Sequence, residues 1–185
     1  MNKRQLEGMK VAILVTDGFE QSEMTDPRKA LEAAGAETKI VSPRNDRVRG
    51  WKHSDPADAF TVDIPLAQAA AHEFDALLLP GGVMNPDALR INEPAVVFVQ
   101  DFVKARKPIA AICHGPWTLI EAKAVEARTM TSWPSLRTDL KNAGAKWVDE
   151  EVVVDGNLVT SRSPKDLPAF DREMVRLFAD AHAHA

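Results

Sequence analysis

The only cysteine of the chain lies in the segment KPIAAICHGPW, which spans residues 107–117. A lone cysteine is often an inert buried residue, so its neighbours decide between packing and chemistry. Here Ala111 stands two positions before Cys113, and Gly115 stands two positions after it. Small residues at these positions let a strand turn sharply into a helix, as in the nucleophile elbow of hydrolases. The pattern therefore predicts an exposed nucleophile at Cys113, with His114 beside it to move protons.

The predicted elbow also indicates an ionised thiol, because the start of a helix carries the positive end of the macrodipole and lowers a thiol pKa. Glu20 follows the first predicted strand at the same sheet edge, where it is placed to share a proton with the sulfur. Glu23, one helical turn further on, is interpreted as a surface helix residue, with a supporting position behind Glu20 as the alternative. Backbone N–H groups of Gly81 and Gly82, joined by that of His114, are candidate oxyanion donors. A plain tight turn is the alternative interpretation of the two glycines.

Strand-like and helix-like segments alternate along the chain, which predicts an α/β fold. We expect a flavodoxin-like three-layer sandwich with a mostly parallel sheet and helices on both faces, in one domain over residues 1–185 with a core at about 9–178. The predicted strands are 11–15, 38–41, 76–79 and 108–112, with a hairpin at 152–160. The predicted helices run from Asp26-Pro27 to Gly35, at 93–104, from the elbow to Lys123, at 135–143 and at 167–181.

The composition and charge of the chain argue against several classes of function. A net charge of −4 and a pI near 5.7 argue against a nucleic-acid partner, and the basic segment at 44–52 is interpreted as a solvated loop. We expect a soluble, cytoplasmic protein that binds no membrane, because no signal peptide or spanning segment is present and one cysteine forms no internal disulfide. His53, Asp55 and His72 lack the spacing of a metal site, so no metal or other cofactor is predicted.

Five separated motifs point to a family: DGFEQSEM, LLLPGG, AICHGPW, TSWPSLRTDLKNAGAKWVDEEVVVDGN and TSRSPKDLPAF. On these residues the chain resembles, from Met9 to about Phe178, the PfpI-type intracellular proteases. That family belongs to the DJ-1/PfpI superfamily of class I glutamine amidotransferase-like folds. The resemblance implies that Cys113 is the nucleophile, that His114 is its histidine, and that Glu20 is the glutamate that poises the thiol.

The resemblance also implies oxyanion and substrate-binding roles for Gly81, Gly82 and Gly115. In this family a glutamate just past the double glycine, supplied by a neighbouring subunit, orients the histidine. The matching acid here is Asp87, in a loop leaving the sheet edge; its side chain is one carbon shorter and the loop one residue longer than the family pattern. We therefore expect a homo-oligomer, a dimer that the family pattern extends to a hexamer, in which Asp87 reaches His114 across the interface.

The resemblance implies a stress-related enzyme and leaves its substrate open among intracellular peptidase, protein deglycase and glyoxalase activities. Each begins with a thiolate attacking a carbonyl-derived carbon, so a small carbonyl compound, a peptide or a glycated protein is expected. The alternative is a non-catalytic redox sensor or holdase chaperone with an oxidisable Cys113, which needs neither His114 nor Asp87. A glutaminase is disfavoured, because that class takes its histidine and acid from late in the chain and residues 163–165 offer neither.

Overall fold

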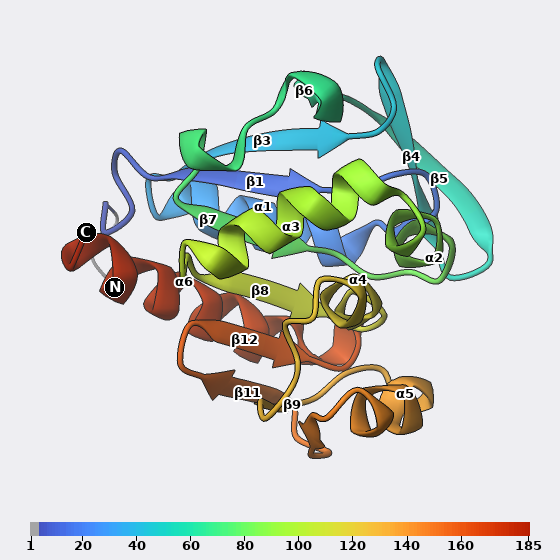
Figure 1. Cartoon of the computed structure of the whole chain (residues 1–185). Helices are drawn as coiled ribbons and strands as arrows, with labels where there is room; N and C mark the ends of the chain where they lie inside the picture. Colours follow the sequence, from blue (N-terminus) through green and yellow to red (C-terminus); the bar gives the residue numbers. More distant parts are fainter. Residues whose placement is uncertain (1–3) are drawn as a thin grey trace.

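The apolar runs of the sequence become the strands of a central sheet. The computed structural model describes residues 4–185, and within them seven strands lie side by side (Figure 1). All neighbouring pairs are parallel except β11 and β12, which form the predicted antiparallel hairpin. In spatial order the strands are β11 (Val152–Asp155), β12 (Leu158–Ser161), β8 (Ile109–Ile112), β7 (Ala76–Leu79), β1 (Lys10–Leu14), β3 (Glu37–Ser42) and β6 (Ile64–Pro65).

Helices cover both faces of this sheet, α1 and α6 behind it and α3 in front of it in Figure 1. The α-helices of the described residues are α1 (Ser22–Ala33), α2 (Met84–Arg90), α3 (Glu93–Lys104), α4 (Pro116–Glu121), α5 (Arg137–Asn142) and α6 (Leu167–Ala183). Short 3-10 turns are η1 (Leu66–Gln68), η2 (Ala71–Glu73), η3 (Pro134–Leu136) and η4 (Pro164–Asp166). The helix predicted at 135–143 is therefore the turn η3 followed by α5.

Two hydrophobic cores separate the three layers, because successive side chains of a strand point to opposite faces. In β1, Val11 and Ile13 pack with α1 and α6, whereas Ala12 and Leu14 pack with the helices of the other face. Both faces of the strand are thus fully buried, as expected for a central parallel strand. The predicted flavodoxin-like α/β sandwich is confirmed.

The order of the strands decides which loops meet. Strands β7, β1 and β8 are parallel, with β7 between the other two, so all three end at one edge of the sheet. The segments that follow them, at 15–21, 80–83 and 113–115, therefore come together at that edge. An open α/β sheet binds its ligands at such an edge.

The solvated loop predicted at 44–52 is wrong, because most of this segment is a strand. Val48 and Gly50 are buried while the arginines between and around them are exposed, and this two-residue alternation is typical of a strand with one covered face. The resulting sheet projects from the body of the molecule (Figure 1). It contains β2 (Phe19–Glu20), β4 (Arg47–Lys52) and β5 (Asp55–Thr61), with β4 in the middle.

The first helix begins earlier than predicted. Asp26 and Pro27 were expected to start it, but α1 begins at Ser22 and Pro27 lies inside it. The early start is stabilised by packing, because Glu23, Pro27 and Leu31 are four residues apart and form one buried stripe. A proline is tolerated there at the cost of one backbone hydrogen bond.

Helix α2 was not predicted, because Asp87 was expected in a loop after the double glycine. Pro86 is the third residue of α2, within the first turn, where the missing N–H of proline costs no helical hydrogen bond. A third small sheet pairs β9 (Thr129–Met130) with β10 (Lys146–Trp147). Among the helices of residues 4–185, none is long and apolar enough to cross a membrane.

Candidate active site

The predicted sharp turn from a strand into a helix at Cys113 is confirmed. Strand β8 ends at Ile112, α4 begins at Pro116, and Cys113 between them has a φ of +61°, in the left-handed region that non-glycine residues rarely adopt. Two backbone bonds hold this strained residue: its N–H donates to the Ser161 carbonyl and its carbonyl accepts the Trp133 N–H, each at 3.0 Å. Strain of this kind is typical of functional positions that the surrounding structure fixes.

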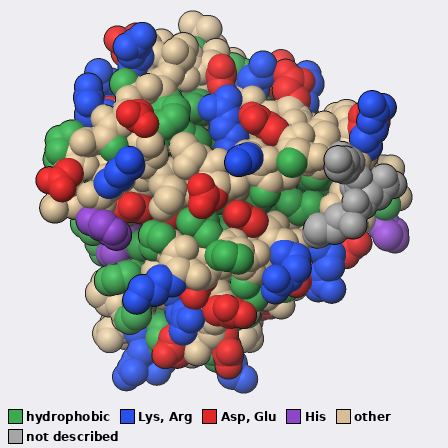
Figure 2. All heavy atoms as spheres, turned by 180° about the vertical axis from the view of Figure 1, so that it is seen from behind, with side chains coloured by type: hydrophobic (Ala, Val, Ile, Leu, Met, Phe, Trp, Pro, Cys, Tyr) green, Lys and Arg blue, Asp and Glu red, His purple; other side chains and the backbone are tan. Residues whose placement is uncertain are grey.

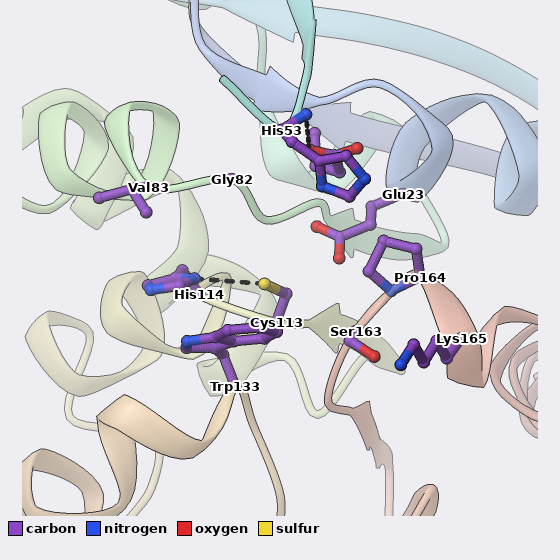
Figure 3. Close-up of a pocket in the computed structure, with 11 residues that line it drawn as sticks. Glu23, His53, Gly82, Val83, Cys113, His114, Trp133, Ser163, Pro164 and Lys165 are labelled. Carbon is purple, nitrogen blue, oxygen red and sulfur yellow. Dashed lines mark hydrogen bonds between the residues drawn. The ribbon is translucent and has the colours of Figure 1, made fainter. Parts of the chain in front are cut away.

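Cys113 opens onto a cavity of about 600 Å³ at the carboxyl edge of the sheet (Figure 3). Its side chain is largely covered, with the whole residue 7% exposed. The volume lies in the range of pockets that enclose drug-sized ligands. The cavity is lined by Glu20, Glu23, His53, Gly82, Val83, Cys113, His114, Trp133, Ser163, Pro164 and Lys165.

The carboxyl group beside the sulfur belongs to Glu23, so the interpretation of Glu23 as a surface residue is wrong. Glu23 is fully buried on the inner stripe of α1 and its carboxyl group points into the cavity toward Cys113 (Figure 3). Its carboxyl faces the thiol and the N–H groups of Gly81 and Gly82, yet neither oxygen has a hydrogen bond of normal geometry in residues 4–185. A buried, unpartnered carboxyl is costly to keep and therefore points to chemistry.

Glu20, predicted to poise the thiol, has a different position. It is half-buried in β2, at the wall of the cavity, and its carboxylate accepts the backbone N–H of His53 at 3.0 Å. This bond ties the tip of the β4–β5 hairpin, where His53 has a φ of +57°, to the catalytic edge. The negative charge of Glu20 acts on Glu23 and raises the pKa of that carboxyl.

The prediction of a lowered thiol pKa is also wrong in direction. Burial, and then the charge of Glu20, raises the pKa of Glu23 from 4.5 to about 8. Burial, and then the charge of Glu23, raises the pKa of Cys113 well above its usual value. At neutral pH the carboxyl and the thiol are therefore both mostly protonated. Once the pair has lost one proton, the thiolate forms when the remaining proton lies on Glu23.

Gly82 and His114 present their backbone N–H groups to the Cys113 sulfur, which favours its thiolate against the effect of burial. Gly81 lies directly behind them. A Cβ on Gly81 would lie 2.5 Å from Glu23 Oε1 and 2.7 Å from Cys113 Cβ. Only glycine therefore lets the carboxyl and the thiol approach each other at this point.

Gly115 does not line the cavity, so its predicted role in binding substrate is not supported. A Cβ at this position would lie 2.5 Å from the carbonyl oxygen of Leu79. The role of Gly115 is instead to let the elbow pack against β7.

His114 is held beside the nucleophile. Its Nδ1 lies 3.2 Å from Cys113 Sγ, and its ring contacts two indoles: Trp117 edge-on at 5.1 Å between centroids and Trp133 stacked at 6.0 Å. Trp117 is itself fixed, because its Nε1–H donates to Asp139 at 3.0 Å. Burial lowers the pKa of His114 to about 4, so the imidazole is neutral at physiological pH.

Asp87 is not brought to His114 within one chain. It is exposed in the first turn of α2 and does not line the cavity. Val83, Met84 and Ile91, in and around the same helix, expose 54%, 47% and 86% of their surface. An apolar surface of this kind next to a site is typical of an interaction surface.

Among the cavity residues without an assigned role in the sequence, three have side chains that can form strong hydrogen bonds or ion pairs: His53, Ser163 and Lys165. His53 reaches the site only through the hairpin that sequence reasoning missed. Ser163 and Lys165 lie shortly after β12, which ends at Ser161, and this position after a parallel strand was the available signal for them. In residues 4–185, no group of three or more His, Cys, Asp or Glu side chains is arranged to hold a metal ion.

The profile of the DJ-1/PfpI family matches residues 9–177 of this chain. General stress protein 18 of Bacillus subtilis is 44% identical over 171 residues, which cover 92% of this chain and 98% of that protein. Protein/nucleic acid deglycase 2 of Escherichia coli is 45% identical over 169 residues, covering 91% and 96%. The putative cysteine protease YraA of B. subtilis is 43% identical over 168 residues, covering 91% and 97%.

Solved structures agree with these sequence relatives. DJ-1beta of Drosophila melanogaster superposes with a TM-score of 0.84 at 26% identity, covering 92% of this chain and 90% of that one. The similarity therefore extends over nearly the whole length of both chains.

Proposed function

Because the chain belongs to the DJ-1/PfpI family, we propose that it is a stress-related, cysteine hydrolase-type enzyme whose Cys113 attacks a carbonyl carbon. The observation that carries this proposal is the arrangement in one cavity of a strained nucleophile, a buried carboxyl and two backbone donors. The printed names of the relatives, a stress protein, a deglycase and a cysteine protease, support the same class.

The first step follows from the positions of the groups. In the molecules whose Glu23 is ionised, the Cys113 proton passes to that carboxylate. The thiolate then adds to the carbonyl carbon, and the electron pair of the C=O bond moves to oxygen. The N–H groups of Gly82 and His114 donate to that oxyanion, which is the largest favourable term in many acyl-transfer sites. Neutral Glu23 no longer opposes the negative charge on sulfur, so one proton transfer serves both groups.

We further propose that Asp87 of a second subunit completes the site. A histidine with a pKa of about 4 is a weak base at neutral pH, and a carboxylate beside it would raise that pKa. The exposed apolar residues around α2 support a homo-oligomeric contact at this end of the molecule, a dimer or a larger assembly such as a hexamer. A two-fold contact would complete two sites at once.

The expected substrate is a protein-borne or small carbonyl adduct, with deglycase, peptidase and glyoxalase activities sharing the first step. Acidic and basic side chains are interspersed over the face that Figure 2 shows, and the net charge is −4, which supports a carbonyl or protein substrate over nucleic acid. We place the enzyme in the cytoplasm, because a reducing compartment keeps a single catalytic thiol free.

A redox sensor is the alternative, and the neighbourhood of Cys113 argues against it. A sensor requires an accessible thiolate, whereas Cys113 is 7% exposed and its pKa is raised. A sensor also has no use for a histidine 3.2 Å from the sulfur or for a cavity of this volume.

The test compares the wild-type protein with Cys113→Ser on methylglyoxal, on a glycated peptide and on an unfolded protein. We expect turnover of at least one of the three and its loss in Cys113→Ser. Equal rates for both proteins on every substrate would refute the proposed Cys113-dependent enzymatic activity.

A further inference from the structure

One wall of the cavity carries a positive charge that the proposed chemistry does not use. Ser163 and Lys165 lie on the side of the cavity away from His53, and the Lys165 amino group points toward the Ser163 hydroxyl (Figure 3). Both follow β12, so the register of the sheet brings them to the same edge as Cys113.

The charge of Lys165 is not neutralised by a neighbour in residues 4–185. The acid next to it in the sequence, Asp166, is buried and bonded to Arg162 through both of its oxygens, at 2.9 and 3.0 Å. Arg162 also pairs with Asp149 at 2.9 Å. Asp149 and Asp166 are therefore both paired with Arg162. In residues 4–185 the structure records no ion pair for Lys165.

The opposite wall is acidic. Glu20 accepts the backbone N–H of His53, at the end of the cavity away from Lys165, and the carboxyl of Glu23 lies between His53 and the Cys113 sulfur (Figure 3). A substrate that carries an anionic group is repelled from the Glu20 end and attracted to the Lys165 end. The uncharged carbonyl carbon of the substrate is then positioned next to the Cys113 sulfur.

We propose that Ser163 and Lys165 bind a carboxylate on the carbonyl compound that Cys113 attacks. The substrate class is an aldehyde or ketone with a carboxylate a few bonds from the carbonyl, either a small oxo acid or an adduct of an amino acid. This inference rests on the proposed function, since it names the substrate class of the same site. Lys165 donates to the carboxylate as a charged partner and Ser163 through its hydroxyl.

The chemistry at the carbonyl is unchanged by this subsite. The S–C bond forms, the π pair of the carbonyl moves to oxygen, and the thiol proton reaches that oxygen through Glu23. The carboxylate takes part in no bond change. It fixes the direction in which the carbonyl faces the sulfur, which is how remote binding contributes to rate.

Two alkylating reagents test the subsite without any turnover. Iodoacetate and iodoacetamide have nearly the same shape and react with the same sulfur by displacing iodide, but only iodoacetate carries a carboxylate. The ratio of their rates at Cys113 cancels changes in thiolate fraction. Relative to a small free thiol, we expect the wild-type protein to favour iodoacetate.

Lys165→Met should lower the ratio of iodoacetate to iodoacetamide rates by about threefold, the range of a solvent-exposed ion pair. Lys165→Arg should leave this rate ratio unchanged, and Ser163→Ala should lower the ratio by less than Lys165→Met does. Lys146→Met is the matched control, since Lys146 is an exposed lysine of β10 outside the cavity. Added salt should reduce the wild-type preference, because the charge is exposed.

The substrate class is tested with glyoxylate, an aldehyde next to a carboxylate, against neutral glyoxal. Glyoxylate should protect Cys113 from iodoacetamide at a lower concentration than glyoxal does, and Lys165→Met should remove the difference. Rate ratios equal to that of a free thiol, or unchanged in Lys165→Met, would overturn the subsite. Since neither assay needs turnover, an enzyme inactive on carbonyl compounds would refute the proposed function and leave these ratios intact.

Discussion

The thiol and the carboxyl of the site are best understood as one titrating unit. Glu23 is fully buried with a pKa raised to about 8, and Cys113 beside it also has a raised pKa. Neither group ionises easily alone, because burial penalises both charges. Once Glu23 has lost its proton, the thiolate forms by moving the thiol proton over a short distance to that carboxylate.

Replacing Glu23 with glutamine should lower the thiol pKa by about one unit or more, because the charge of Glu23 contributes to raising it. The measurement is the rate of Cys113 alkylation by iodoacetamide against pH. Glu7→Gln, an exposed glutamate remote in sequence from the site, is the control and should leave the profile as in the wild type. An unshifted profile in Glu23→Gln would mean that the two groups do not interact.

Trp117 and Trp133 enclose the His114 ring, and burial is what lowers its pKa to about 4. Trp117→Ala should admit water and raise the His114 pKa by about one unit or more toward 6.5, whereas Trp117→Phe should change it less. NMR titration of the imidazole measures this directly. Trp51→Ala, in the hairpin, serves as a control, and a pKa that stays near 4 in Trp117→Ala would contradict the role of the indole.

Helix α2 fixes the oxyanion segment to the end of β1. The side chain of Asn85, fully buried, accepts the Thr16 N–H at 2.8 Å and donates to the carbonyls of Pro80 and Gly81 at 3.1 Å. One amide thus joins the segments that follow two neighbouring strands. The geometry of the Gly81-Gly82 turn therefore depends on α2, although no residue of this helix lines the cavity.

Asn85→Ala should lower the free energy of unfolding by about 3 kcal/mol, because it removes the side-chain partner of three backbone groups, two of which are buried. Denaturant unfolding measures this loss. Asn142→Ala, at the exposed end of α5, should change stability by less than about 0.5 kcal/mol. If the two variants unfold alike, Asn85 does not anchor the turn.

On the scale of the whole molecule, the proposed catalytic set is not assembled within one chain. The cavity supplies the nucleophile, the carboxyl and the donors, while Asp87 lies outside it on a surface with exposed Val83 and Met84. Assembly would therefore govern activity as well as stability.

Mixing inactive Cys113→Ser protomers with Asp87→Ala protomers should restore part of the activity, because mixed interfaces then contain one intact set of groups. Asp87→Ala alone should lower turnover with little change in stability, since its side chain is exposed. Turnover is measured before and after subunit exchange. Full activity of Asp87→Ala, or of a dilute monomer, would rule out a contribution across the interface.

The interface between α1 and α6 makes stability depend on pH. Burial and the charge of Asp26 raise the pKa of Asp171 from 3.8 to about 7, and one of its oxygens is buried without a partner in the described residues. The folded state holds this proton up to about pH 7, whereas the unfolded state loses it near pH 4. Stability therefore falls as the pH rises between these values.

Asp171→Asn should accordingly unfold at a higher temperature than the wild type at pH 8, with no gain below about pH 4. Calorimetry at both pH values measures the difference. Asp180→Asn, exposed on the same helix, should give no such pH-dependent gain. An equal gain at both pH values would point to packing in place of ionisation.

The sequence by itself determined the sheet and the strand-to-helix turn around Cys113, because these depend on short-range patterns. Buried strands are continuous apolar runs, and Ala111 and Gly115 mark the turn on both sides of Cys113. The hairpin at β4 and β5 and the helix α2 were missed. Their polar or proline-containing segments become regular only through contacts with distant strands and loops.

Only the tertiary structure decided which glutamate meets the thiol. Glu20 and Glu23 are three residues apart, and both follow the first strand. Packing starts α1 at Ser22, ahead of the expected Asp26, and this places Glu23 on the buried stripe with Leu31. The start of a helix depends on what its side chains pack against, since local propensities differ by only about 1 kcal/mol per residue. The same packing closes the cavity around Glu23 and Cys113, and burial then reverses the direction of the pKa shift that the helix dipole alone predicts.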